Sequence, residues 1–156
     1  MMSSTIEVKV KKLAHFDPAW DLPHYATFFA AGADIRAALS QQGSELVIPV
    51  GKRLAIPTGL SFEIPAGFEI QVRPRSGLSL KTGLMVVNSP GTIDSDYRGE
   101  LMILLGNLGH KEEVIKHGDR IAQLVLAPVV QAKYVSSDEL TTTQRGAGGF
   151  GSTGMD

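Results

Sequence analysis

The sequence predicts one all-β domain, a sandwich or barrel of short strands that carries a single short helix. Three observations support this prediction. Short apolar segments recur at close spacing along the 156 residues, with glycine or proline between them. Phe68, Ile70 and Val72 alternate with charged or polar residues, which is the period of a half-buried strand. Only one segment has the start and stop signals of a helix.

The expected strands follow one another along most of the chain. Ile6, Val8 and Val10 alternate with charged residues and predict the first strand. The other strands are expected at residues 45–48, 52–56, 59–64, 68–73, 84–87, 101–105, 113–115 and 120–130. Residues 15–25 contain two prolines and are expected to form a loop, and residues 31–37 are small and apolar around Asp34 and Arg36.

The one expected helix covers residues 78–82. Ser76 is expected to cap its first turn, and Gly83 is expected to end it. Beyond Tyr134 the chain becomes polar and then rich in glycine. This change predicts a β-barrel core at residues 1–134 and a C-terminal arm at residues 135–156 that stays mobile until something orders it.

The composition is that of an ordinary soluble globular protein, with 43% hydrophobic and 20% charged residues. Fifteen Lys and Arg balance sixteen Asp and Glu, so no overall field attracts nucleic acid or an anionic membrane. The chain contains no cysteine, which excludes disulfides and thiolate chemistry. It shows no signal peptide and no apolar run of about 18 residues. We therefore expect a soluble, cytoplasmic protein without nucleic-acid or membrane partners.

Residues 91–100 are expected to form the tip of a hairpin between the strands at 84–87 and 101–105. This tip carries Asp94, Asp96, Tyr97 and Arg98 between glycines, a set of side chains able to do chemistry. In an extended segment Asp94 and Asp96 share a face, where they could hold Mg²⁺ or raise each other's pKa. Alternatively, both carboxylates only make hydrogen bonds within a turn.

Four other clusters each allow a structural and a functional interpretation. Arg75 and Ser76 at a possible helix start suit a phosphate, or form a capped turn with an exposed arginine. Asp34 could simply bond a neighbouring amide, and Gln123 either satisfies a backbone group or contacts a ligand. The glycine-rich segment 145–154 is either a flexible terminus or an anion cradle, and its spacing does not fit a Walker A loop. The four histidines lack metal-site spacing, and no G-x-S-x-G element exists.

Together the five clusters resemble a known family. A-G-A-D-I-R-A, P-R-S-G-L-S, N-S-P-G-T-I-D-S-D-Y-R-G-E, G-D-R-I-A-Q-L and R-G-A-G-G-F-G-S-T-G are similar, in order and spacing, to the five motifs of the trimeric dUTPases. The resemblance covers residues 6–154. It implies a homotrimer of β-clip or distorted jelly-roll subunits, with three active sites that are each closed by the C-terminal arm of a third subunit.

The resemblance also implies a reaction. It is in-line attack of water on the α-phosphorus of dUTP, which gives dUMP and pyrophosphate, limits uracil incorporation into DNA and supplies dUMP for dTMP synthesis. Asp94 corresponds to the base that deprotonates the water. Asp34 corresponds to the carboxylate that holds the Mg²⁺ cofactor through water. The phosphate contacts correspond to Arg75, Ser76, Gly77, Gln123, Arg145, Gly151, Ser152 and Thr153.

The same resemblance assigns the nucleoside contacts. Tyr97 corresponds to the residue that packs on deoxyribose and rejects a 2′-hydroxyl by steric clash. Phe150 corresponds to the ring that covers uracil. The uracil slot corresponds to residues 88–94, with contacts from Asn88, Gly91, Thr92, Ile93 and Met102.

The chain departs from the family pattern at a few positions. Ala33 and Ile35 stand where bulkier or leucine side chains are common, and Phe28 and Phe29 stand where small residues are frequent. A dCTP deaminase is the nearest alternative, but such enzymes place a glutamate where this chain has Leu104. A non-catalytic trimer that binds dUTP is a second alternative.

Overall fold

The structure is a computed structural model that describes residues 5–39 and 45–149. Within these ranges the chain forms ten β-strands and one helix, α1 (Ser76–Lys81). The expectation of an all-β domain with one short helix is therefore confirmed. None of the described helical segments is long and apolar enough to cross a membrane.

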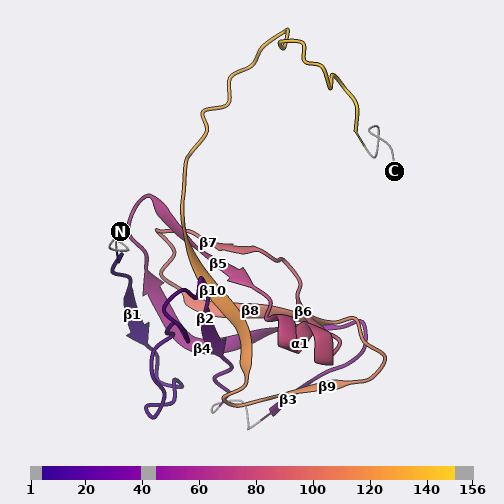
Figure 1. The fold of residues 1–156 in the computed structure, drawn as a ribbon. Coiled ribbons are helices and arrows are strands. Elements are labelled where there is room, and N and C mark those ends of the chain that lie inside the picture. The colour runs from indigo at the N-terminus through magenta and orange to yellow at the C-terminus, as the bar shows by residue number, and fades with distance from the viewer. Residues whose placement is uncertain (1–4, 40–44, 150–156) are drawn as a thin grey trace.

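Two four-stranded antiparallel sheets form most of the body (Figure 1). The first sheet has the order β1 (Lys9–Lys12), β4 (Arg53–Glu63), β8 (Glu100–Asn107), β6 (Leu84–Val86). The second has the order β2 (Ala33–Arg36), β10 (Arg120–Pro128), β5 (Phe68–Arg73), β7 (Gly91–Ile93). β3 (Glu45–Ile48) and β9 (Glu113–Lys116) form a separate two-stranded ladder.

The core lies between the sheets, and β8 shows how the sequence pattern builds it. Leu101, Ile103 and Leu105 are at most 1% exposed, whereas Met102 and Leu104 alternate with them and are more than a third exposed. This alternation follows from the period of two in a strand. The outward face of the first sheet is apolar as well, with Met85, Val87, Met102 and Leu104 partly exposed.

The prediction of two strands at residues 52–56 and 59–64 is wrong, because β4 runs through both. Gly59 has φ +69°, and the pairing of β4 with β8 is irregular between Pro57 and Ser61. A Cβ on Gly59 would lie 2.9 Å from the Cα of Phe16. Proline and glycine here mark a bulge in one strand, not a turn between two strands.

Other boundaries also differ from the prediction. The first strand is shifted to Lys9–Lys12, and β10 ends at Pro128. The small apolar segment before Ala37 contains strand β2, with Ala33 and Ile35 buried.

The prediction of a simple hairpin around residues 91–100 is wrong in one respect. β6 and β8 do pair, with Val86 opposite Leu105. However, the connecting residues leave this sheet: Gly91 to Ile93 form β7, which pairs with β5 in the second sheet. The loop thus joins the two sheets.

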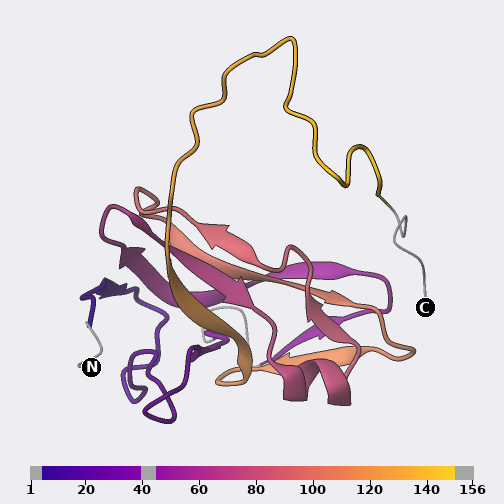
Figure 2. The same cartoon turned by 45° about the horizontal axis from the view of Figure 1, so that its top comes forward.

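The chain leaves the body after β10. Figures 1 and 2 show that the arm beyond Pro128 extends away from both sheets. The hydrogen bonds of residues 131–149 all lie within the arm, for example from Arg145 Nε to the carbonyl of Gly148 at 3.0 Å.

Candidate active site

Three charged side chains from distant parts of the sequence meet at one end of the second sheet. Arg75 Nε donates to Asp34 Oδ1 at 2.8 Å, and Arg120 Nη1 donates to Asp34 Oδ2 at 3.1 Å. Arg75 Nη1 also donates to the carbonyl of Arg120 at 3.2 Å. The three side chains are 27%, 31% and 52% exposed for Arg75, Asp34 and Arg120. Two guanidiniums thus outweigh one carboxylate at an accessible position, which favours binding of an anion.

Gln123 lies beside this cluster and is held by the backbone. In the register of the sheet it pairs with Asp34 on one side and with Arg73 on the other. Its Nε2 donates to the carbonyl of Pro74 at 2.9 Å. A Cβ on Gly32 would lie 2.2 Å from Gln123 Oε1, so a larger residue there would displace the Gln123 amide. The structure therefore brings the first, second and fourth sequence clusters together, which we name the phosphate cluster (Asp34, Arg75, Arg120, Gln123).

The prediction that Ser76 caps the helix is wrong. Helix α1 begins at Ser76 itself, and the preceding Arg75 occupies the N-cap position without a side-chain cap bond. The exposed Ser76 hydroxyl has no hydrogen-bond partner in the described part of the chain, while the Arg75 guanidinium donates to Asp34. A Cβ on Gly77 would have no neighbour within 4 Å. The start of α1 thus presents a free hydroxyl beside Arg75.

Asp94 lies at the other end of the second sheet. It follows β7 and starts a turn in which the Tyr97 N–H donates to the Asp94 carbonyl at 3.2 Å. Asp94 and Asp96 therefore do not lie in an extended segment, and the premise that they share a strand face is wrong. The Tyr97 hydroxyl donates to the carbonyl of Glu100 at 3.0 Å. A Cβ on Gly99 would lie 2.4 Å from that hydroxyl, so the glycine makes room for the ring.

The predicted uracil slot lies next to β5. Gly91 is buried, and a Cβ there would lie 3.1 Å from Asn88 Nδ2 and 3.2 Å from the Cβ of Val72. Asn88 and Thr92 are exposed, and Ile93 is half-buried opposite Ile70. Met102, by contrast, lies on the outward face of the first sheet. The structure does not bring Met102 to the other four residues within one chain.

One chain does not combine the phosphate cluster with Asp94. Ile93 pairs with Ile70, so Asp94 lies four residues along β5 from Arg73, about 13 Å at ~3.3 Å per residue. Arg75 lies further on, and Figure 1 shows the loop after β7 and helix α1 at opposite ends of β5. The hollow beside Asp94, of about 550 Å³, is lined by Glu69 and Asp96 and by no Lys or Arg among the described residues.

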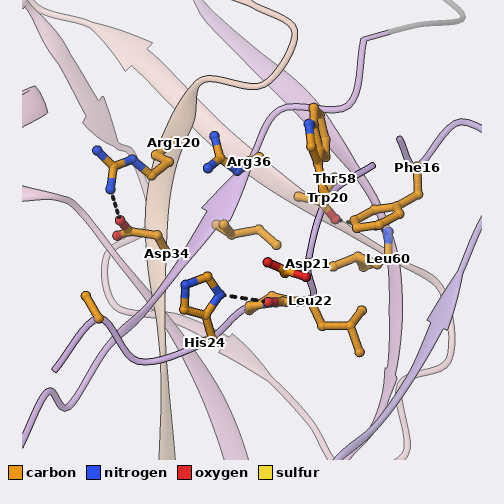
Figure 3. A pocket seen from close by; sticks show the side chains of 13 residues that line it. Phe16, Trp20, Asp21, Leu22, His24, Asp34, Arg36, Thr58, Leu60 and Arg120 are labelled. Atoms are coloured by element: carbon orange, nitrogen blue, oxygen red, sulfur yellow. Dashed lines mark hydrogen bonds and ion pairs between the residues drawn. The ribbon is translucent and has the colours of Figure 1, made fainter. Parts of the chain in front are cut away.

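A second cavity lies on the inner side of Asp34 and Arg120, under the loop that contains Trp20 and His24 (Figure 3). Its volume of about 90 Å³ would hold about three water molecules at ~30 Å³ each. A nucleotide needs several hundred Å³. This cavity is therefore not the substrate site.

A model described as dUTPase matches residues 18–154 of this chain. The chain belongs to the dUTPase family.

Bacterial dUTPases are similar to this chain over nearly all of its length. The deoxyuridine 5′-triphosphate nucleotidohydrolase of Bdellovibrio bacteriovorus is 55% identical over 149 residues, which cover 96% of this chain and 97% of that protein. The enzyme of the same name from Desulfotalea psychrophila is 58% identical over 139 residues, covering 86% and 87%. A mutant dUTPase of Staphylococcus bacteriophage 80alpha, solved with dUpNHpp, has a TM-score of 0.83 at 26% identity and covers 97% of this chain and 100% of that one.

The dUTPase family implies a divalent metal. Within residues 5–39 and 45–149, no three His, Asp or Glu side chains gather into a metal-binding group. Asp34 accepts one guanidinium bond on each oxygen, which leaves lone pairs for water ligands of a metal. The residues fit a metal held through water at Asp34, with direct oxygen ligands supplied by the nucleotide phosphates.

Not every predicted contact of the dUTPase site can be located. Arg145 lies on the exposed arm, and the predicted contacts Phe150, Gly151, Ser152 and Thr153 lie outside the described residues. Sequence reasoning also missed Arg120, although it directly precedes Ile121 in the fourth motif. Its ion pair with Asp34 spans 86 residues, and only the pairing of β10 with β2 reveals it.

Proposed function

We propose that this protein hydrolyses dUTP to dUMP and pyrophosphate at sites that are each assembled from more than one chain. As a member of the dUTPase family, it is a dUTP diphosphatase. The main support for an assembled site is that the cationic residues and Asp94 lie at opposite ends of β5. One end presents two guanidiniums, and its carboxylate, Asp34, is bonded to both. The other end presents Asp94 in an acidic hollow that no described Lys or Arg lines. Neighbouring copies that bring the two ends together would complete the site.

The phosphate cluster would bind the triphosphate. Arg75 and the free Ser76 hydroxyl lie side by side at the start of α1, with Gly77 allowing close approach. Gln123 is oriented by its bond to Pro74, so its amide position is set before ligand arrives. Cations and fixed donors of this kind stabilise the charge that develops on the phosphates during attack.

Asp94 of a neighbouring copy would be the base. Asp94 is exposed at the start of a turn, which leaves room for a water molecule and for the α-phosphorus. The turn from Asp94 to Tyr97 fixes the backbone on which the carboxylate stands. Attack needs the base within about 3 Å of the water, a geometry that the neighbouring copy must supply.

The loop that joins the two sheets would recognise the nucleoside. Asn88, Gly91, Thr92 and Ile93 would form the uracil slot, where backbone amides and carbonyls imitate a pairing base. Tyr97 would pack on deoxyribose, since its ring is held by the bond to the Glu100 carbonyl and is nearly half exposed. A rigid ring at this place leaves no space for a 2′-hydroxyl.

The arm would close the site. Arg145, together with Ser152 and Thr153, would clamp the γ-phosphate, Phe150 would cover uracil, and Gly151 would allow close approach. The described part of the arm makes no hydrogen bond to its own body after residue 130, which supports an arm that reaches another chain. Its closing would exclude bulk water from the reacting phosphates.

Mg²⁺ would be held by the three phosphates and, through water, by Asp34. When bound, such an ion neutralises phosphate charge and orients the triphosphate. The pairs with Arg75 and Arg120 hold the Asp34 carboxylate in place.

A homotrimer is supported by the outward face of the first sheet. Met85, Val87, Met102 and Leu104 are 36–44% exposed there, on β8 and on or directly after its neighbour β6. A contiguous apolar face of this kind usually marks an interface. Met102 would then face a neighbouring chain and not the nucleotide of its own.

The test is pyrophosphate release from dUTP, dCTP, dTTP and UTP, with and without Mg²⁺. Wild type is expected to act on dUTP alone and to need the metal. Asp94→Asn is expected to lose about 10²–10⁴-fold in rate while still binding dUTP, because it removes the base and preserves the shape. Asp21→Asn, a matched change on an exposed loop, should leave the rate unchanged. Ammonia release from dCTP would instead show a deaminase, and dUTP binding without turnover would show a binding protein.

A further inference from the structure

Phe28 and Phe29 form an exposed aromatic pair that the proposed reaction does not use. Their rings are 89% and 92% exposed, and they contact each other edge to face with centroids 4.9 Å apart. They occupy the two central positions of a turn closed by the Ala30 N–H and the carbonyl of Thr27 at 3.1 Å. This turn needs no aromatic side chains, because its bond is made by the backbone alone.

A short segment of chain joins the pair to the phosphate cluster. Phe29 precedes Asp34 by five residues, which span at most about 17 Å. The base of the loop is fixed, since Tyr25 bridges to Ala33 and Gly32 packs against Gln123. The two rings are therefore held near the phosphate cluster on a short, anchored loop, and not on a free tail.

Unlike the anchored loop, the C-terminal arm extends from the body, and it carries apolar residues that its own chain does not cover. Leu140 is 88% exposed, and the arm extends away from both sheets in Figures 1 and 2. Residues 129–149 could span up to about 70 Å at ~3.3–3.6 Å per residue, enough to reach another subunit. Leu140 precedes Arg145 by five residues, again at most about 17 Å.

These two spans match. We propose that Phe28 and Phe29 form a docking knob for the arm of a second copy, and that Leu140 of that arm packs against the two rings. This inference rests on the proposed function, in which Arg145 of the arm reaches the phosphates beside Asp34. With Arg145 there, Leu140 lies within reach of the loop that carries the two rings. Two rings at right angles offer an apolar corner that an isobutyl side chain fills.

Docking at this point would act on closure and not on chemistry. The arm must be ordered each time it closes, and an apolar anchor before the glycine-rich segment lowers that entropic cost. The knob is thus a positioning element, and removing it should weaken arm closure while the phosphate cluster stays intact.

The experiment compares Phe28→Ser/Phe29→Ser, Leu140→Ser and the combined variant with wild type, and uses Leu108→Ser as a matched control for loss of an exposed leucine (73%). Tryptic cleavage of the arm after Lys133 and Arg145 is followed with and without saturating dUpNHpp. In wild type and Leu108→Ser the analogue should slow cleavage. The pair variant and Leu140→Ser should each be cut about tenfold faster in its presence, and the combined variant no faster than either.

Three results would overturn the docking knob. One is full protection in the pair variant, and another is a combined variant whose cleavage rate reflects two independent losses. The third is dissociation of the pair variant in sedimentation, which would place the rings against the body of a neighbour. Pyrophosphate release by wild type separates this failure from that of the proposed function. Turnover of dUTP with an arm that dUpNHpp never protects would overturn the knob alone.

Discussion

Replacing Gly32 with alanine should disturb Gln123 through a single steric contact. The new Cβ would lie 2.2 Å from Gln123 Oε1 and 3.0 Å from its Cδ, so the amide must move by about 1 Å or more. That movement breaks the bond from Nε2 to Pro74, worth about 1 kcal/mol. It also strains the side-chain rotamer by about 0.5–1.5 kcal/mol. Alanine regains about 0.4–1 kcal/mol by restricting the unfolded chain. The net loss of stability is about 1 kcal/mol.

The assay is thermal unfolding at one fixed chain concentration, because assembly makes the midpoint depend on concentration. Gly32→Ala should lower Tm by about 2–4 °C. In a Gln123→Ala background the two nearest atoms are gone and only the Cβ at 3.3 Å remains. There the same change should be neutral or slightly stabilising, which gives a coupling of about 1–2 kcal/mol. An equal loss in both backgrounds would refute the contact as its cause.

Two further predictions concern stability. The backbone N–H of Ala19 and the ring of His117 hold the pKa of the Asp17 carboxyl below its ordinary value of 3.8. The resulting stabilisation is present above pH 3.8 and is lost as the pH falls through the folded-state pKa, so Asp17→Asn should lower Tm at pH 7 and progressively less as the pH falls below 3.8. A difference in Tm that stays constant with pH contradicts this. Gly51→Ala and Gly59→Ala both place alanine at a positive φ, but only Gly59 meets the N-terminal loop. Denaturant unfolding should show a loss of about 1–2 kcal/mol for Gly51→Ala and about 1–3 kcal/mol more for Gly59→Ala, whereas equal losses would show that the contact yields freely.

The strands were predictable from their apolar residues, most clearly where one face of the strand is buried and the other is exposed to solvent. Phe68 to Arg73 alternates between apolar and polar residues, and Leu101 to Leu105 is a continuous apolar run; both segments are strands. Pro57 and Gly59 misled the prediction because the same residues mark turns and bulges. Only the pairing partner β8 decides between the two.

The site was less predictable than the strands. Sequence alone indicated that Asp34, Arg75 and Gln123 carry chemistry, but it could not show that Asp34 holds two guanidiniums. Those contacts join residues 41 and 86 positions apart and depend on the order β2-β10-β5. The hairpin prediction failed for a similar reason: the exchange of Gly91–Ile93 into the second sheet is a long-range choice that local propensity does not encode.

The separation of Asp94 from Arg75 along β5 has a genetic consequence. If neighbours complete each other's sites as proposed, every chain supplies cations to one site and the base to another, besides the arm that closes a site. A chain defective in either role would then inactivate sites in assemblies that also contain intact chains. Conversely, Asp94→Asn chains and Arg75→Ala chains, each inactive alone, would rebuild about one working site in four when mixed at random. Two variants of one gene, each inactive alone, would then complement each other.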